Sequence, residues 1–324
     1  MLSRTRAALL LGFLVLLWGV NWPLSKIALN YTPPVLFAGI RTLLGGVILL
    51  FFALPRIKQL QFKKTWYFYF ISAFLNIVLF YGLQTVGLGY MPAGLFSAIV
   101  FIQPVLLGIF SWLWLGESMY KLKIIGLILG FIGVAIISAG GLSGNISSIG
   151  ILFALGSAVG WGLGTIFIKK IGNAVDSIWM VSLQLIIGGI FLLCVGSNME
   201  NWSSIQWNIP FVSNLLFISI FVIAFGWLAF FTLVGSGEAS KVGSYTFLIP
   251  LISIIASSIF LHESITIKLV IGLLFIVTSI CFVNIKFKQK GIEELLQAFQ
   301  QVKEQTSERV KLVIIGSRRD QNFI

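Results

Sequence analysis

The chain has 324 residues, of which 58% are hydrophobic and 10% are charged, and its mean hydropathy is +1.02. Soluble domains carry about one quarter charged residues, so this composition excludes a soluble globular protein and predicts an integral membrane protein. The net charge of +12 would by itself suit a nucleic-acid-binding protein. We expect no nucleic-acid partner, because the basic residues gather in the short segments between apolar stretches.

Apolar stretches close to the ~20 residues that cross a bilayer follow one another along most of the chain. They predict an all-α integral membrane protein with ten transmembrane helices, at about 7–29, 35–54, 66–86, 93–115, 122–140, 149–168, 177–196, 211–233, 242–261 and 267–285. Cys194 and Cys281 lie in two of these stretches without metal-ligand spacing. No cofactor and no metal are expected.

The chain contains two related halves. Residues 89–137 align without a gap onto 235–283 at a shift of 146, and a shift of 143 places Trp18-Gly19 on Trp161-Gly162. Duplicated apolar units are typical of membrane carriers. We therefore predict a first repeat at 1–140 and a second at 149–286, each with five spans, followed by a cytoplasmic amphipathic or disordered tail at 287–324.

The basic residues predict the orientation of the helices. If the N-terminus is inside, fourteen Lys and Arg residues fall at cytoplasmic ends of spans, and only Lys268 lies outside. Cytoplasmic loops carry such an excess of basic residues, so we predict that both termini are cytoplasmic. Because five is an odd number of spans, the second repeat must enter from the opposite side, which gives two inverted five-helix repeats. The fourteen residues are Arg4, Arg6, Arg56, Lys58, Lys63, Lys64, Lys121, Lys123, Lys169, Lys170, Lys241, Lys286, Lys288 and Lys290.

Three sequence elements resemble a known transporter family. They are WGVNWPLSK at 18–26, FAGIRTLLGG at 37–46, and the paired P-x(12)-E elements from Pro104 to Glu117 and from Pro250 to Glu263. In their order and doubling they are similar to the EamA family of the drug/metabolite transporter superfamily, in its ten-span form, and the resemblance covers about residues 7–286. It implies a multi-pass carrier of the cell membrane that moves small metabolites by alternating access, frequently an exporter of amino acids, amines or toxic compounds.

Two basic side chains are candidates for the substrate pathway. Ionisable groups in a bilayer cost about 2.5–3.5 kcal/mol each on insertion scales, so each needs a reason. Arg41 lies about six residues into its span, and a guanidinium can hold a carboxylate with two parallel hydrogen bonds. The alternative is an arginine that snorkels outward or holds backbone carbonyls. Lys26 lies near the outer end of its span, where it can reach water; with Arg41 it would make the outer half of a cavity positive.

Uncharged polar and aromatic residues within the spans form a larger candidate set. Amides in hydrocarbon need partners across helices or in a wet cavity, and tryptophan rings can stack against amines. Packing or a position at the membrane interface is the favoured explanation of each residue on its own, yet several of the set are expected to line the pathway. Asn76, Tyr81 and Gln84 are spaced close to one helical face, which we expect to look inward. The candidates are Asn21, Trp22, Asn76, Tyr81, Gln84, Gln103, Trp161, Thr165, Gln184, Trp227 and Tyr245.

Prolines and glycines indicate where helices bend and touch. Pro23, Pro104 and Pro250 each remove a backbone hydrogen bond within a span, so we expect hinges there. Small residues at helical spacing predict close helix packing on two faces. These faces are formed by Gly126, Gly130 and Gly133 and by Gly156, Gly160 and Gly164.

Two glutamates occupy equivalent positions at the ends of two spans, Glu117 and Glu263. A carboxylate there favours the N-terminus of the following helix, so we expect a capping role for both. His262 is the only histidine of the chain. Its ordinary pKa of about 6.5 would suit proton sensing at the outer mouth beside Glu263; the alternative is a histidine that is simply solvated.

These features favour a secondary active or facilitative transporter and no enzymatic activity. No Asp or Glu lies at mid-membrane depth, whereas proton-driven carriers use such carboxylates as relays, so substrate exchange or facilitated diffusion is favoured. The alternatives are a multidrug efflux carrier, a membrane-embedded enzyme, which would need convergent catalytic side chains, and a channel, which would favour a continuous polar stripe. The expected partners are a small-molecule substrate and the lipid bilayer, and a homo-oligomer is an open alternative to a monomer.

Overall fold

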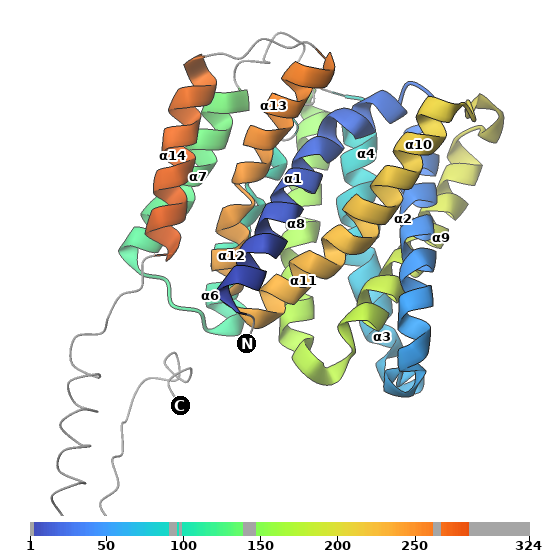
Figure 1. Ribbon diagram of the computed structural model, residues 1–324, viewed down its shortest axis with the longest axis horizontal. Helices are drawn as coiled ribbons and strands as arrows, with labels where there is room; N and C mark the ends of the chain where they lie inside the picture. Colours follow the sequence, from blue (N-terminus) through green and yellow to red (C-terminus); the bar gives the residue numbers. More distant parts are fainter. Residues whose placement is uncertain (1–2, 91–95, 97–98, 139–146, 262–266, 285–324) are drawn as a thin grey trace, which may run out of the picture.

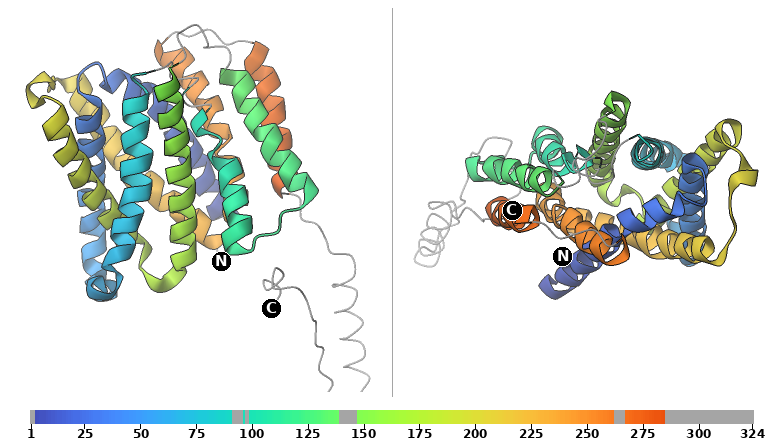
Figure 2. Two further views of the ribbon diagram at one scale, coloured as in Figure 1. Left: turned by 180° about the vertical axis from the view of Figure 1, so that it is seen from behind. Right: turned by 90° about the horizontal axis from the view of Figure 1, so that it is seen from above.

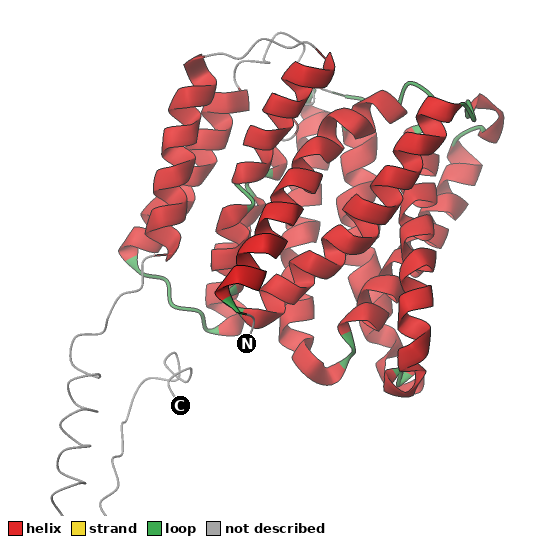
Figure 3. Ribbon diagram, in the orientation of Figure 1, coloured by secondary structure: helices red, strands yellow, loops and turns green. Residues whose placement is uncertain are grey.

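The computed structural model describes residues 3–90, 96, 99–138, 147–261 and 267–284, and in this part of the chain the regular structure is helical throughout (Figure 3). The predicted tail at 287–324 lies outside the described residues. The first half contains α1 (Arg4–Ala28), α2 (Pro34–Ala53), η1 (Leu54–Gln59), α3 (Phe62–Ala73), η2 (Phe74–Gly82), α4 (Leu83–Gly87), α6 (Gln103–Leu115) and α7 (Lys121–Ser138). The second half contains α8 (Ser148–Ile171), η4 (Gly172–Ala174), α9 (Ser177–Met199), η5 (Trp202–Ser204), α10 (Ile209–Phe217), η6 (Ile218–Phe225), α11 (Gly226–Ser236), α12 (Ala239–Tyr245), α13 (Leu248–Leu261) and α14 (Ile267–Asn284).

Six helical stretches of the described chain are long and apolar enough to cross a membrane. Two of them are composite: α3, η2 and α4 join into one rod over 62–87, and α10, η6 and α11 join into another over 209–236. In hydrocarbon every backbone polar group must be satisfied internally, and helices achieve this within each segment. α6 and the Val270–Asn284 part of α14 are also apolar but shorter.

The two halves of the chain traverse the molecule in opposite directions (Figure 1; Figure 2). α1 begins and α14 ends at the lower end of Figure 1, whereas α7 ends and α8 begins at the opposite end. We refer to the lower end as the basic end, because η1, the segment 116–120 and the turn 172–176 lie there with Arg56, Lys121 and Lys169 on or beside them. The opposite end is the far end.

The halves pack mainly against each other. α2 packs along α9, and α7 packs along α14. α1 packs against α13, and α6 packs in the same way against α8. Under the repeat shifts these are pairs of equivalent contacts, as an inverted repeat about a two-fold axis would produce.

Glycines allow the backbones of the two halves to approach closely. A Cβ added to Gly189 would stand 2.7 Å from the backbone nitrogen of Leu43, which lies on α2. α7 and α14 meet in the same manner, because a Cβ on Gly133 would lie 2.8 Å from the carbonyl oxygen of Gly272. Small residues are the usual means of such close helix contact in membranes.

Both small-residue faces predicted from the sequence are confirmed as contact faces. One face of α7 meets α14 and the segment before α13, and one face of α8 meets η2 and α4. The glycines on these faces are Gly126, Gly130 and Gly133 on α7 and Gly156, Gly160 and Gly164 on α8.

The starts of α2 and α9, which are equivalent in the two repeats, are capped differently. Asp176 precedes α9, and its carboxylate accepts the first N–H groups of that helix. Pro33 stands at the equivalent place before α2 and offers no such group. Instead, the carboxylate of Glu200, at the end of α9, accepts the N–H groups of Val35 and Leu36 at 3.0 and 2.8 Å. The second half thus supplies the cap that α2 lacks, where a negative charge also suits the helix dipole.

Equivalent π-helical segments, η2 and η6, interrupt the third rod of each half. Such segments displace the usual ladder of backbone hydrogen bonds and are frequent at functional sites. Ser157 of α8 donates to the carbonyl oxygen of Phe80 at 3.0 Å, and Trp18 Nε1 of α1 donates to that of Val222 at 3.2 Å. In both rods, therefore, the first helix of the opposite half bonds to the π-helical backbone.

The three prolines expected to form hinges lie in different settings. Pro23 lies inside α1, which continues through it. Pro104 and Pro250 lie in the first turns of α6 and α13, where the missing N–H is one that a helix leaves free anyway. The predicted span 242–261 is therefore corrected: it is not one bent helix but divides into α12 and α13 at Thr246, before its proline.

Replacing Gly189 by Ala is expected to destabilise the protein. The added methyl group meets the α2 backbone at 2.7 Å, and overpacking of this kind costs about 1–3 kcal/mol. Gly12→Ala is the matched control, because a Cβ there meets nothing within 4 Å and alanine favours a helix by about 1 kcal/mol. Thermal unfolding in detergent should show a lower midpoint for Gly189→Ala and an unchanged or higher one for Gly12→Ala. Equal midpoints would contradict the close contact of α2 and α9.

Candidate functional site

Arg41 lies on α2 in the interior of the bundle, with 1% of its surface exposed. Its Nη1 donates to Ser25 Oγ at 3.1 Å, and its Nη2 donates to Thr85 Oγ1 at 3.0 Å. The guanidinium also stands over the rings of Phe37 and Tyr81, 4.8 Å from each centroid. The side chain therefore stays inside the bundle, held by α1 and α4, and does not extend to the membrane surface.

No carboxylate among the described residues forms an ion pair with Arg41; the ion pairs found there join other side chains. Within the same part of the chain its Nε atom has no hydrogen-bond partner. Hydroxyl groups and ring faces stabilise a cation only in part, whereas removing a charge from water costs several kcal/mol. The site thus holds a positive charge that an anionic group would stabilise.

Five aromatic rings from both halves extend from Arg41 into the centre of the bundle. Trp227 Nε1 donates to Tyr81 Oη at 2.8 Å. The Trp227 ring lies 5.7 Å from that of Trp18, which lies 5.4 Å from that of Trp161. Trp161 in turn stacks on Phe80 with centroids 5.0 Å apart. We refer to these residues, Tyr81, Trp227, Trp18, Trp161 and Phe80, as the aromatic cluster.

Several buried polar atoms on the helices around the aromatic cluster have no partner within the described structure. They are Trp161 Nε1, Gln84 Oε1 and both terminal atoms of the fully buried Gln103. Buried polar groups are ordinarily hydrogen-bonded, and an exception needs an explanation. Unused donors and acceptors of this kind are available to a polar ligand.

Asn76 and Gln184 meet in a separate polar network between the third rod and α9. Ser72 Oγ donates to Gln184 Oε1 at 2.5 Å, and Asn76 Nδ2 donates to the same oxygen at 3.3 Å and to Ser72 Oγ at 3.2 Å. Gln184 is the repeat equivalent of Arg41. The two halves therefore place a guanidinium and an amide at matching positions, each with its own set of partners.

Other residues proposed from the sequence lie close to Arg41 or to the aromatic cluster. Asn21 Oδ1 accepts from Ser25 Oγ at 3.1 Å and so joins the hydrogen bonds around Arg41. Trp22 is buried with its ring 6.2 Å from that of Phe101, which is also 6.2 Å from Trp161. The three side chains expected on one inward face, Asn76, Tyr81 and Gln84, are all buried.

The remaining candidates are not brought into this group. Lys26 is exposed, and Tyr245 is half-buried on α12. Thr165 is buried and donates to the carbonyl oxygen of Trp161 in its own helix at 2.8 Å. His262 and Glu263 lie outside the described residues, so their proposed proton-linked role remains a prediction.

A cluster of charged residues, separate from Arg41, joins the two halves at the basic end. Glu117 Oε1 accepts from the N–H of Ala239 at 2.6 Å, and its Oε2 accepts from the N–H of Ser240 at 3.3 Å and from Ser240 Oγ. Lys123 Nζ lies 3.5 Å from Glu117 Oε2 and 3.4 Å from Glu238 Oε2, with its side chain fully buried. We refer to Glu117, Lys123, Glu238, Ala239 and Ser240 as the clasp.

The capping role expected for Glu117 at the start of the following helix is wrong. Its carboxylate caps α12 of the opposite half, not α7, the helix that follows it. Gly116 ends α6 in the left-handed region with φ of 70°, a conformation that glycine adopts without strain. The chain turns there and brings the carboxylate to the positive end of α12.

Sequence reasoning missed most partners of the candidate residues. Ser25, Thr85 and Phe37 contact Arg41, yet none is unusual for an apolar span. Two signals were present: Ser25 lies one helical turn from Asn21, and Trp18 is the repeat equivalent of Trp161. Within the described residues, no group of three or more His, Cys, Asp and Glu side chains is placed to hold a metal ion.

Both halves of the chain match a known family. Residues 5–139 and 148–285 each match the model described as the EamA-like transporter family. A Bacillus subtilis protein named "Uncharacterized transporter YvbV" is 70% identical over 287 residues, which cover 89% of this chain and 94% of that protein.

More distant relatives carry a functional name. An Escherichia coli protein named "Probable amino-acid metabolite efflux pump" is 26% identical over 308 residues, covering 88% of this chain and 96% of that protein. A Salmonella typhimurium protein of the same name is 28% identical over 283 residues, covering 79% and 88% respectively. A solved crystal structure with 16% identity superposes with a TM-score of 0.74 over 87% of this chain and 97% of that chain, which establishes the likeness of fold.

Truncating Glu117 is expected to destabilise the protein strongly. Glu117→Ala leaves the buried Lys123 without one of its two carboxylate partners and frees two N–H groups of α12, and breaking a buried ion pair costs about 3–5 kcal/mol. The double variant Glu117→Ala/Lys123→Met should recover part of that loss, because it removes the buried charge that has lost a partner. Thermal unfolding of the purified variants measures both effects; a double variant no more stable than Glu117→Ala would contradict the pairing.

Proposed function

The chain belongs to the EamA-like transporter family and is a multi-pass membrane transport protein; from that premise we propose that it exports small metabolites bearing a carboxylate across the cell membrane by alternating access. Amino acids and related amines that carry a carboxylate are the substrate class that we favour. The substrate and the surrounding lipid bilayer are the partners that this function requires.

The observation that carries the proposal is the buried guanidinium of Arg41. It is held by two neutral hydroxyls and two ring faces, its Nε is unused, and no described carboxylate pairs with it. A substrate carboxylate would supply the missing negative charge with charge-assisted hydrogen bonds. When the substrate leaves, the hydroxyls and ring faces still stabilise the Arg41 charge in part. The free energy gained on substrate binding is therefore limited, and the substrate can be released.

The aromatic cluster supports a substrate with an apolar or cationic part beside the carboxylate. A cation–π contact between a ring face and an ammonium group contributes a binding free energy of about 0.5–2 kcal/mol, and ring faces also pack against aliphatic or aromatic groups. A zwitterion could thus place its carboxylate at Arg41 and the rest of the molecule against Tyr81 and Trp227, which contact each other. The names of the Escherichia coli and Salmonella relatives, amino-acid metabolite efflux pumps, support this choice of substrate class.

We further propose ten spans in two inverted repeats, with the basic end in the cytoplasm. The excess of Lys and Arg on the segments at that end supports this orientation. In this arrangement the clasp closes the cytoplasmic side, and opening requires Glu117 to leave the start of α12. With no described carboxylate beside Arg41, we favour substrate exchange or facilitated diffusion as the mode of transport.

A multidrug efflux carrier is the second candidate. The same cluster of rings would accept flat organic cations without strict geometry, and nothing in it selects one ring system. The two functions differ in their dependence on Arg41: a cation without a carboxylate gains nothing from the guanidinium and is repelled by it.

Arg41→Gln is expected to reduce transport of carboxylate substrates at least tenfold, because the hydrogen bonds of a charged group are worth about 1.5–3 kcal/mol. The measurement is counterflow of labelled amino acids in liposomes loaded with the same unlabelled compound, after a first screen selects an amino acid that the parent protein carries. Arg41→Lys is the matched control that keeps the charge without the planar fork, and should retain part of the activity.

Equal counterflow rates for Arg41→Gln and the parent would show that Arg41 is not the anion anchor. Size-exclusion profiles and unfolding midpoints of both variants exclude misfolding as the cause of a loss. Efflux of organic cations that is unaffected or improved in Arg41→Gln would instead favour the multidrug function.

Membrane orientation is testable with single cysteines in a background in which Cys194 and Cys281 are replaced by Ser. A membrane-impermeant maleimide should label Ser148→Cys in intact cells, because α8 begins at the far end. Ser3→Cys and Lys170→Cys should be labelled only after permeabilisation. Labelling of Ser3→Cys and Ser148→Cys from the same side would contradict the inverted repeat.

A further inference from the structure

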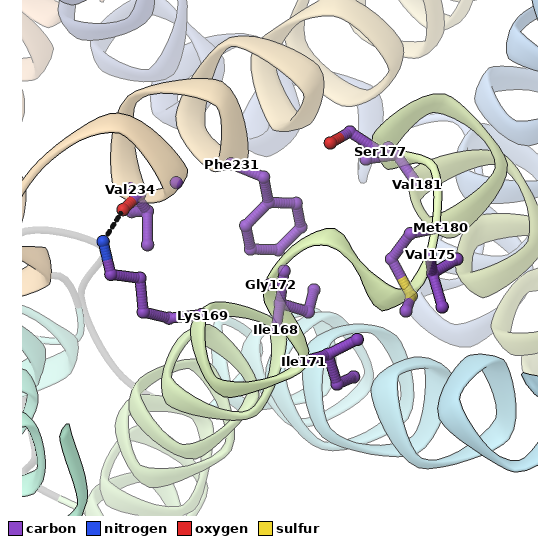
Figure 4. Close-up of a pocket in the computed structure, with 11 residues that line it drawn as sticks. Ile168, Lys169, Ile171, Gly172, Val175, Ser177, Met180, Val181, Phe231 and Val234 are labelled. Atoms are coloured by element: carbon purple, nitrogen blue, oxygen red, sulfur yellow. Dashed lines mark hydrogen bonds between the residues drawn. The ribbon is translucent and has the colours of Figure 1, made fainter. Parts of the chain in front are cut away.

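A cavity of about 220 Å³ opens at the basic end between α8, α9 and α11, away from Arg41 (Figure 4). Its floor is apolar and buried, formed by Met180, Val181 and Phe231. Ser177, at the first turn of α9, is exposed at its rim. Pockets for drug-sized ligands span about 300–1,000 Å³, so this one suits a smaller molecule with a short apolar part.

Lys169 stands at the edge of this cavity and is half-buried (Figure 4). Its Nζ donates to the carbonyl oxygen of Val234 at 2.6 Å and to that of Gly237. These carbonyls belong to the last turn of α11 and to the turn before α12, so the ammonium holds the C-terminal end of one helix. The turn leads directly to Ala239 and the clasp.

The acidic groups near the cavity are engaged elsewhere. Asp176 caps α9 and pairs with Arg56 at 3.2 Å. Glu117 and Glu238 interact electrostatically with Lys169 but bind the clasp residues, including Lys123. Neutral carbonyls are the hydrogen-bond acceptors of the Lys169 ammonium, and a carboxylate would be bound more strongly, because it adds the Coulomb attraction of a full negative charge.

We propose that this cavity is a loading site at the inner mouth, which binds a small carboxylate with a short apolar tail, and that the bound carboxylate takes Lys169 from the carbonyls of Val234 and Gly237. The tail lies on Met180, Val181 and Phe231. Release of the α11 end frees the turn before α12, on which the clasp depends. Substrate arriving from the inside thus loosens the closed side before it reaches Arg41.

This inference rests on the proposed function for its direction, but its site is separate from Arg41. We therefore test it in the full-length Arg41→Gln protein, in which the central anchor is absent. The probe is labelled hexanoate, with hexylamine and hexanamide as competitors that lack the carboxylate. Hexanoate should bind and neither competitor should displace it.

Lys169→Met should weaken hexanoate binding at least tenfold in this background. Val181→Phe, which keeps the lysine but fills the floor, should weaken it as well. Lys170→Met is the matched control, because that neighbouring lysine is exposed and does not line the cavity. Equal hexanoate affinity in Lys169→Met and Lys170→Met would overturn the proposal, as would displacement of hexanoate by palmitate, which would assign the cavity to membrane fatty acids.

Loosening of the clasp has its own measurement. Ala239 is fully buried, so in a background with Cys194 and Cys281 replaced by Ser, Ala239→Cys should react slowly with a maleimide. Hexanoate should raise that rate several-fold, and the rise should disappear with Lys169→Met. An unchanged rate at saturating hexanoate would overturn the link to the clasp. A failure of Arg41→Gln to affect transport would refute the central anchor and leave these results unaffected.

Discussion

A buried guanidinium that forms no ion pair with any described carboxylate is the constraint around which the centre of this protein is arranged. Arg41 is buried in this structure, and its charge is stabilised by the hydroxyls of Ser25 and Thr85 and by the faces of Phe37 and Tyr81. These groups come from α1, α2 and the third rod, which must stay together for the charge to be tolerated. A site that tolerates a charge without neutralising it is suited to bind an anion and release it again, as a carrier must.

Each half of the chain supplies caps and hydrogen bonds that the other half needs. Glu200 of the second half caps α2, Glu117 of the first half caps α12, and the π-helical segments each receive a hydrogen bond from the opposite half. Glycine contacts bring α2 close to α9 and α7 close to α14. These hydrogen bonds join one half to the other. A movement of one half against the other therefore has to break some of them. At the basic end these bonds include those of the clasp and the ion pair between Arg56 and Asp176.

Sequence alone predicted the helical architecture, the duplication and the small-residue contact faces, since these depend on periodicity and composition, which are visible in the sequence itself. It also singled out Arg41, because an ionisable residue in an apolar span is conspicuous. It could not predict the division of the span at 242–261 or the partner of Glu117, which depend on how the backbone turns at Thr246 and Gly116. The partners of Arg41 are common residues whose role arises only when α1, α2 and α4 come together, so no local pattern marks them.

We propose that transport by this protein depends most directly on recognition of a carboxylate by Arg41. The decisive measurement uses isothermal titration calorimetry with two ligands, a transported amino acid and its amide, which lacks the carboxylate. The dissociation constants of both ligands are compared for the parent protein and for Arg41→Gln. We predict that the parent binds the amino acid at least tenfold more tightly than the amide, a difference of about 1.4 kcal/mol, and that Arg41→Gln loses this preference. Equal discrimination by both proteins would contradict the account.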